Sequence, residues 1–402
     1  MPDTPITASV PRLSRPWYTQ FMALLIVVLA PIGQMAIDIF VPSLPLMAAE
    51  FATDRQVVQL SVTLYLAAFA AGQLVYGPVS DSWGRRRTLI VGILVFILGS
   101  LMCILAPSMG WFIAGRVVQG AGITAASVLM RAIATDCFQG PRLTQVLTYM
   151  VIGWGMGPIV APVIGAFFQT TLGWRYSLVF LLVYGTLLLG MVALVMKETH
   201  AKPVAFSLGR VVRGIGTVYG SKRFDLIFLA MGCCYGALLA FNLVGPFIVQ
   251  TVMGHGPEVF GAVALAMGAM YFGGVFSNRL MPATVTVRTR FGVASHGAWW
   301  AAVAQVAFAW AFDGQLWALA LPFALVVFFS GVMYPNLMAL GMSAFAHMAG
   351  LASSLLGFSL MVIAAAIMGL ASLLQVQSLL PFALMVLALM GAVFWLVRWV
   401  RP

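Results

Sequence analysis

Long apolar segments alternate with short polar connections along the whole chain. Charges, prolines and polar clusters divide the sequence into segments at about residues 18–46, 57–77, 88–106, 111–134, 144–169, 175–196, 224–250, 258–278, 291–312, 316–340, 351–374 and 379–398. An α-helix rises 1.5 Å per residue, so roughly 20 apolar residues cross a hydrocarbon core about 30 Å thick. The pattern therefore predicts an all-α membrane protein with twelve transmembrane helices.

The longest polar connection, residues 197–223, separates the first six segments from the last six. Its apolar residues follow helical spacing and alternate with basic ones, which predicts a short amphipathic helix on an anionic membrane surface. We therefore expect an amino-terminal six-helix half at 1–196, a cytoplasmic linker at 197–223 and a carboxy-terminal six-helix half at 224–402.

Composition supports a membrane location. Of the 402 residues, 62% are hydrophobic and 8% are charged, a balance that excludes a water-soluble domain of this size. The net charge of +11 comes from short basic clusters between apolar segments, so it indicates membrane orientation rather than nucleic-acid binding. The first apolar segment lacks a small-residue cleavage site before its end, so we expect a first spanning helix and no signal peptide.

The basic clusters fall on alternate connections. With a cytoplasmic amino terminus, the cytoplasmic side holds Arg12, Arg15, the arginines at 85–87, Arg131, Arg142, the basic residues of 197–223, Arg279, Arg288, Arg290, Arg398 and Arg401, and the opposite side holds Arg55 and Arg175. Because cytoplasmic loops are enriched in Lys and Arg, both termini are expected to be cytoplasmic.

The sequence offers no motif for a cofactor. Its four histidines are scattered over separate connections, and its four cysteines lie in or beside apolar segments, so no cluster has metal-ligand spacing. We find no phosphate loop, nucleotide-binding motif or nucleophile elbow. We expect neither a metal nor a cofactor, and an enzyme would need a set of reactive groups that the sequence does not supply.

Two charged residues stand inside predicted membrane segments. Asp38 lies in the first segment and Arg116 opens the fourth. An ionised group in hydrocarbon costs about 2.5 to 3.5 kcal/mol on insertion scales, so both are candidate functional residues, and we expect them to pair. Low dielectric disfavours the charged form of a carboxyl group, which brings proton uptake and release by Asp38 into reach. The alternatives are a hydrated carboxylate near the outer mouth and an arginine that extends to the outer interface.

Other polar residues interrupt the apolar segments. We expect them to face a central, adaptable substrate cavity: Gln34, Tyr65, Gln73, Gln119, Tyr235, Asn242 and Asn336. Each could equally form an interhelical hydrogen bond, which contributes about 0.6 kcal/mol on average.

A charged motif lies between the second and third segments. It reads Gly77-x-x-x-Asp81-x-x-Gly84-Arg85-Arg86-Arg87, and we expect a hinge in water on the cytoplasmic side. A degenerate echo, Gly274-x-x-x-Asn278-Arg279, follows the eighth segment and indicates an internal repeat of a six-helix unit.

The fifth segment is rich in small residues. Gly153, Gly157, Pro158, Pro162 and Gly165 would let this helix pack closely against a neighbour and bend. Close packing alone would explain this composition.

These motifs together resemble the bicyclomycin/chloramphenicol-resistance branch of the major facilitator superfamily, the drug:proton antiporters. The resemblance rests on the segments 38–45, 77–87, 116–120, 131–136 and 153–165. It implies two six-helix halves around a midplane site, efflux of small lipophilic drugs across the bacterial inner membrane, and a monomer whose partners are substrate, protons and membrane lipids.

The same resemblance implies roles for individual residues. Asp38 would bind the proton with Arg116 as its polar partner, the antiporter motif would be Gly153, Gly157, Pro158 and Gly165, and the gate would comprise Gly77, Asp81, Gly84, Arg85, Arg86, Arg131 and Asp136. This chain has Ala30 where some relatives carry a second acid, which argues against a two-carboxylate mechanism. A metabolite or siderophore exporter and a proton-coupled uptake symporter remain alternatives.

Overall fold

The computed structural model describes residues 15–200, 216, 219–282, 285–343, 349–374 and 377–400. Within these ranges every regular element is a helix. Most of the expected linker, including the expected amphipathic helix, lies outside the described residues.

The first half contains six long helices. Its elements are α1 (Pro16–Asp38), a 3₁₀ turn (Val41–Ser43), α2 (Leu44–Glu50), α3 (Arg55–Trp83), α4 (Arg85–Ile104), α5 (Met109–Cys137), α6 (Gly140–Thr171) and α7 (Arg175–Gly190), which runs into a π-helical turn (Met191–Val195).

The second half also contains six long helices within the described residues. Its elements are α9 (Lys222–Pro246), which runs into a π-helical turn (Phe247–Val252), then α10 (Pro257–Leu280), α11 (Val287–Ala311), α12 (Leu316–Ser343), α13 (Ala349–Ser372) and α14 (Leu380–Trp399).

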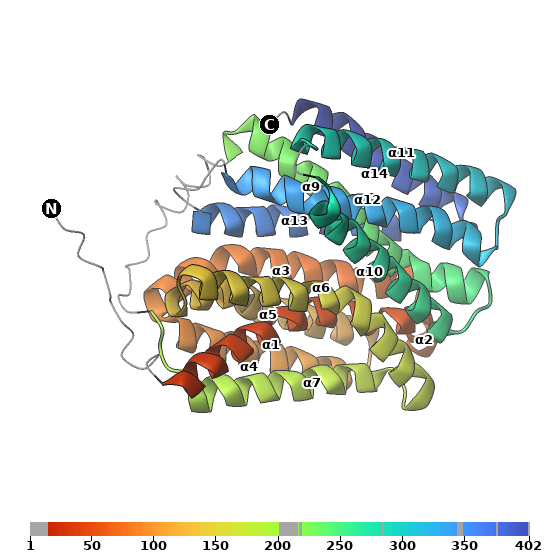
Figure 1. Ribbon diagram of the computed structural model, residues 1–402. Coiled ribbons are helices and arrows are strands. Elements are labelled where there is room, and N and C mark those ends of the chain that lie inside the picture. The colour runs from red at the N-terminus through yellow and green to blue at the C-terminus, as the bar shows by residue number, and fades with distance from the viewer. Residues whose placement is uncertain are drawn as a thin grey trace.

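The predicted fold is confirmed. In the described part of the chain, eleven helical segments are long and apolar enough to cross a membrane, and the first of them joins α1 to α2. The remaining long helix, α11, packs beside α12 and α14. The two halves lie one against the other, with α1 to α7 below and α9 to α14 above in Figure 1.

Two helix pairs join the halves. α3 packs along α13, and α6 packs along α10. α1 and α9 approach each other inside the molecule, where side chains of the two helices meet. Polar side chains of α1 and α9 therefore meet at the interface between the halves.

The junction between α3 and α4 differs from the expected hinge. α3 continues through Gly77 and Pro78 to Trp83, and α4 begins at Arg85, so Gly84 alone breaks the helix. Gly84 has a φ of +95°, a conformation that residues with a side chain rarely adopt, and a Cβ there would collide with the carboxylate of Glu198. The break between the two helices is therefore confined to one residue, because transmembrane helices tolerate an internal proline such as Pro78 when neighbouring groups restore the backbone contacts.

Candidate functional site

Asp38 ends α1 and is completely buried. One carboxylate oxygen accepts a 2.7 Å hydrogen bond from Nε2 of Gln34, one turn earlier on α1. The other oxygen accepts a 2.7 Å hydrogen bond from Nδ2 of Asn242 on α9. The carboxylate of Asp38 therefore joins the two halves of the protein.

Tyr235 extends this connection. Its hydroxyl, on α9, donates a 2.6 Å hydrogen bond to Oε1 of Gln34. Each half contributes two residues to one chain of hydrogen bonds, Tyr235–Gln34–Asp38–Asn242, which we call the polar bridge. Of the residues expected to face a central cavity, the structure brings Gln34, Tyr235 and Asn242 together around Asp38.

Two opposing effects act on a carboxyl group in such a place. Amide N–H donors stabilise the ionised form, whereas removal from water stabilises the neutral acid. The side chain of Gln34 can present either its NH₂ group or its carbonyl oxygen to a neighbour. The polar bridge can therefore accommodate Asp38 with or without a proton.

The expected ion pair between Asp38 and Arg116 is not formed in the structure. Both acidic oxygens already accept from amide groups, while the Arg116 guanidinium lies over the rings of Phe40, at 4.4 Å, and Tyr65, at 4.1 Å. A cation–π contact contributes about 2 kcal/mol when desolvated, which partly offsets the cost of burying the guanidinium. The two residues therefore interact electrostatically without an ion pair, and aromatic rings pack on the arginine instead.

Arg116 is nevertheless incompletely satisfied. It donates to Oε1 of Gln119, which in turn donates from Nε2 to Oγ of Ser100 at 2.8 Å. Its Nε and Nη2 have no hydrogen-bond partner among the described residues. Asp38 is close enough to interact with this charge electrostatically. Arg116 thus supplies a buried positive charge beside the polar bridge without contacting it.

The other expected cavity residues lie elsewhere. Tyr65 donates to the carbonyl of Gly33 at 2.9 Å and Gln119 faces α4, so both belong to the interior of the first half. Gln73 lies against Gly357 where α3 meets α13. Asn336 donates to Asn278 at 2.7 Å, between α12 and α10. Of these four, Tyr65, Gln119 and Asn336 form interhelical hydrogen bonds, which was the alternative interpretation of their sequence pattern.

The glycines of the antiporter motif on α6 face α1. A Cβ on Gly153 would lie 3.1 Å from the carbonyl oxygen of Val27, and one on Gly157 would lie 2.8 Å from Cβ of Gln34. A Cβ on Gly165 would collide with the carbonyl oxygen of Ile39. These glycines let α6 approach the segment of α1 that carries Gln34 and Asp38.

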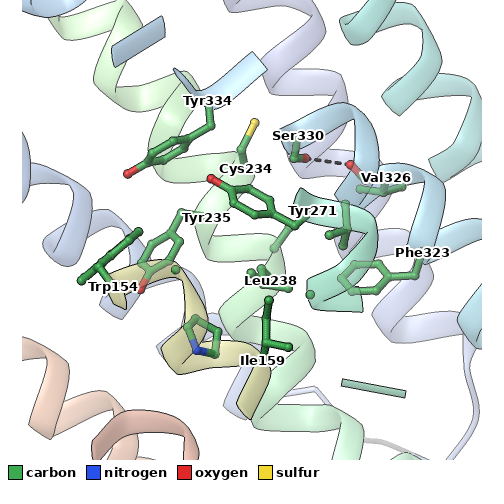
Figure 2. A pocket seen from close by; sticks show the side chains of 15 residues that line it. Trp154, Ile159, Cys234, Tyr235, Leu238, Tyr271, Phe323, Val326, Ser330 and Tyr334 are labelled. Atoms are coloured by element: carbon green, nitrogen blue, oxygen red, sulfur yellow. Dashed lines mark hydrogen bonds between the residues drawn. The ribbon is translucent and has the colours of Figure 1, made fainter. Parts of the chain in front are cut away.

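A cavity lies beside the polar bridge, between α6 of the first half and α9, α10 and α12 of the second. Figure 2 shows Trp154 and Tyr235 together on one side of it, with Phe323 and Val326 on the other. The rings of Trp154 and Tyr235 are stacked, with centroids 6.1 Å apart. Pro158 of the antiporter motif also lines this cavity.

A charged cluster surrounds the start of α4. Arg85 donates to Asp81 at 2.5 Å and to Asp136 of α5 at 3.2 Å. Arg86 instead donates to backbone carbonyls of the π-helical turn after α7, including that of Ala193 at 2.6 Å. Arg131 lies on α5, as Asp136 does, and interacts electrostatically with Tyr334 of α12. This part of α5 therefore lies close to the second half.

Sequence reasoning missed Glu198. Its carboxylate accepts from the backbone N–H of Arg85 at 2.8 Å and of Arg86 at 3.2 Å, and so caps the amino terminus of α4. Thr199 adds a hydrogen bond to Asp136 at 3.3 Å. An acid directly after a membrane segment was a weak signal, because its partner helix begins more than a hundred residues earlier in the chain.

Comparison with known proteins places this arrangement in a family. The Major Facilitator Superfamily matches residues 24–369. Multidrug resistance protein D of Escherichia coli (strain K12) is 28% identical over 344 residues, 84% of each chain. The bicyclomycin resistance protein homolog of Haemophilus influenzae (strain ATCC 51907 / DSM 11121 / KW20 / Rd) is 26% identical over 336 residues, 82% of this chain and 83% of that one.

A solved D-xylose–proton symporter shares the fold, with a TM-score of 0.72 over 94% of this chain and 97% of that one, at 13% identity. The resemblance to drug-resistance transporters is thus confirmed at modest identity, and the family consists of transporters rather than enzymes. This multi-pass membrane protein belongs to the major facilitator superfamily.

Proposed function

We propose that this chain is a proton-coupled multidrug antiporter of the bacterial inner membrane, which exports small lipophilic compounds of the chloramphenicol or bicyclomycin kind. The observation that carries the proposal is the buried carboxylate of Asp38, which accepts one hydrogen bond from each half. Relatives named for multidrug and bicyclomycin resistance support the same substrate class.

The polar bridge provides a physical link between protonation and rocking of the halves. An ionised Asp38 accepts from Asn242 across the interface, and charge-assisted hydrogen bonds are about twice as strong as neutral ones. A proton on Asp38 removes that charge and weakens the bond between the halves. Proton binding then favours separation of α1 from α9, and proton release favours their contact.

In the proposed orientation both termini and the 197–223 linker are cytoplasmic. The Arg85 cluster then lies at the cytoplasmic end of the first half, where Asp81 and Asp136 hold the start of α4. Asp38 carries the proton, and Arg116 acts as a fixed charge beside it because a guanidinium does not release its proton in proteins.

The test is proton release from purified protein in weakly buffered detergent when chloramphenicol is added. The wild type should release protons, and Asp38→Asn should release none. Asp54→Asn is the control, because Asp54 is an exposed acid with no side-chain role in capping its helix. Release from Asp38→Asn equal to that of the wild type would assign the proton to another group.

A second measurement establishes the direction of coupling. Proteoliposomes with an acidic lumen should accumulate chloramphenicol inside as protons leave. If chloramphenicol instead accumulates only when protons flow into the lumen together with it, the protein is an uptake symporter.

A further inference from the structure

We propose that the cavity between α6, α9, α10 and α12 binds an uncharged, ring-bearing ligand. Tyr235 transmits the presence of that ligand to Asp38 through Gln34. The inference rests on the proposed antiporter function and assigns its substrate class and its coupling residue. Two features support it. One is the chemistry of the cavity wall, and the other is that Tyr235 belongs to both the cavity wall and the polar bridge.

The cavity wall is rich in aromatic and aliphatic side chains. Its residues come from α6, α9, α10 and α12, and none of them is Asp, Glu, His, Lys or Arg. Trp154 stacks on Tyr235 with an angle of 29° between the ring planes, and Tyr271 meets Tyr334 edge-on with centroids 6.5 Å apart. Flat rings at these separations offer stacking surfaces to a further ring.

An organic cation would be poorly matched to this wall. Removing a charge from water is costly unless an opposite charge or several hydrogen bonds replace the water, and a cation–π contact returns only about 2 kcal/mol. Asp38 is not among the lining residues, so it gives a ligand in the cavity no direct counter-charge. The chemistry of the wall therefore favours neutral ring compounds over permanently charged ones.

Tyr235 belongs to both the cavity and the polar bridge. Its ring forms part of the wall beside Trp154, as Figure 2 shows, while its hydroxyl donates to Gln34 at 2.6 Å. Gln34 in turn donates to Asp38 at 2.7 Å. A ligand that packs on the ring of Tyr235 thus affects a hydroxyl group two hydrogen bonds from the carboxylate.

The orientation of the Gln34 amide makes this connection directional. While the Tyr235 hydroxyl donates to Oε1, the amide must point its NH₂ group at Asp38, and an N–H donor favours the carboxylate. If the hydroxyl moves away, the amide can rotate and accept a hydrogen bond from a protonated Asp38. A ligand that holds the Tyr235 ring in place therefore favours loss of the proton from the Asp38 carboxyl group to water.

The test compares two hydroxyl deletions in the same cavity. Tyr235→Phe keeps the stacked ring, so its Kd for chloramphenicol should change by less than about threefold, while protons released per bound molecule should fall by about fivefold or more. Tyr271→Phe removes a hydroxyl from the same wall without touching Gln34, and its ratio of protons released to ligand bound should equal that of the wild type. Tyr235→Phe with the wild-type ratio would overturn the coupling role.

Further measurements keep the inference separate from the proposed function. Gln34→Met breaks the hydrogen-bond connection between Tyr235 and Asp38 at a residue outside the cavity wall, and it should also lose proton release. This variant tests the coupling role even if Tyr235→Phe fails to fold. If the wild type itself releases no proton, the antiporter proposal fails. If the wild type releases protons, and Tyr235→Phe and Gln34→Met release as many per bound molecule, the antiporter proposal stands and the coupling role of Tyr235 and Gln34 fails.

The ligand class has its own comparison. Chloramphenicol should bind the wild type about tenfold or more tightly than tetraphenylphosphonium, a permanently charged ring compound, which corresponds to about 1.4 kcal/mol. Equal or tighter binding of the cation would overturn the assignment to neutral ligands.

Discussion

Asn242 donates a 2.7 Å hydrogen bond to Asp38 from the opposite half of the protein. The acceptor ends α1 and the donor lies within α9, so this bond connects the two halves, which rock against each other in the proposed mechanism. Both side chains are buried, and water does not compete with the bond in this conformation.

Replacement of Asn242 by leucine should therefore uncouple the halves while leaving each of them intact. A hydrogen bond to a charged group contributes about 1.5 to 3 kcal/mol, so proton-driven transport in proteoliposomes should fall about tenfold or more. The thermal midpoint in detergent should fall modestly, because the bond is lost while leucine still fills a similar volume. Gln305→Leu, a buried amide inside the second half on α11, is the matched control and should leave proton coupling unchanged. Normal coupling in Asn242→Leu would show that the bond is dispensable.

Alanine substitutions along α6 should have graded effects. The added methyl group would collide with the Ile39 carbonyl at Gly165, lie 2.8 Å from Cβ of Gln34 at Gly157, and lie 3.1 Å from the Val27 carbonyl oxygen at Gly153. Because the overlap decreases in this order, Gly165→Ala should abolish folded protein, Gly157→Ala should lower activity several-fold, and Gly153→Ala should have the mildest effect.

Size-exclusion profiles in detergent and transport rates would measure this series. Gly190→Ala is the control, because a Cβ at Gly190 meets open space. An ordering in which Gly153→Ala is the most damaging would contradict the close approach of α6 to Ile39.

Asp81 and Asp136 should share the task of holding Arg85. The Asp81 pair spans one turn and its acid is half exposed, whereas the Asp136 pair joins α4 to α5 with a more buried acid. Because exposed ion pairs contribute about 0 to 1 kcal/mol, Asp81→Asn alone should reduce transport only a few-fold and leave chloramphenicol binding intact. Asp136→Asn should cost more, and the double variant should lose more than the sum. Equal losses of binding and transport would place the cluster in the substrate site.

The contribution of Arg116 to proton-coupled transport should depend on both its positive charge and its planar shape. Lysine keeps the charge but lacks the planar group that lies between Phe40 and Tyr65, and methionine keeps part of the volume without charge. We expect Arg116→Lys to retain a measurable fraction of proton-coupled transport and Arg116→Met to retain none, although both bind chloramphenicol. Equal activity of the two variants would remove any role for the positive charge.

Cys234 gives a chemical probe of the cavity. It is one of the lining residues, and all four cysteines are free. In a variant with Cys103, Cys137 and Cys233 changed to alanine, chloramphenicol should slow modification of Cys234 by a small methanethiosulfonate reagent at least about threefold at saturating ligand. Unchanged labelling would place the ligand elsewhere, and tetraphenylphosphonium is the comparison compound.

The helices were predictable because the membrane itself dictates their length and composition. The expected segment 258–278 corresponds to α10 at Pro257–Leu280, and 316–340 corresponds to α12 at Leu316–Ser343. The helices extend a few residues past the expected ends, because the helical backbone continues beyond the apolar segment. The sequence also singled out Gln34, Asp38, Tyr235 and Asn242, because a polar residue in hydrocarbon needs a partner.

What the sequence could not supply was the choice of partner. Asp38 and Arg116 are an obvious pair when only charges are counted, yet Phe40 and Tyr65 cover the guanidinium and amides satisfy the acid. Aromatic residues are so frequent in these segments that no pattern marks the two that matter. The cap on α4 by Glu198 was hidden for a different reason, since it depends on how the end of the sixth helix returns to the start of the third.

A junction of one residue between α3 and α4 leaves the chain no slack. Two rods joined in this way transmit tilt directly, and α4 has 20 residues, so its far end lies about 30 Å from Gly84. A tilt of about 10° at the junction displaces that far end by about 5 Å, calculated from the same rise per residue. Small adjustments around Arg85 and Glu198 on one side of the membrane are thereby magnified into side-chain-sized movements on the other.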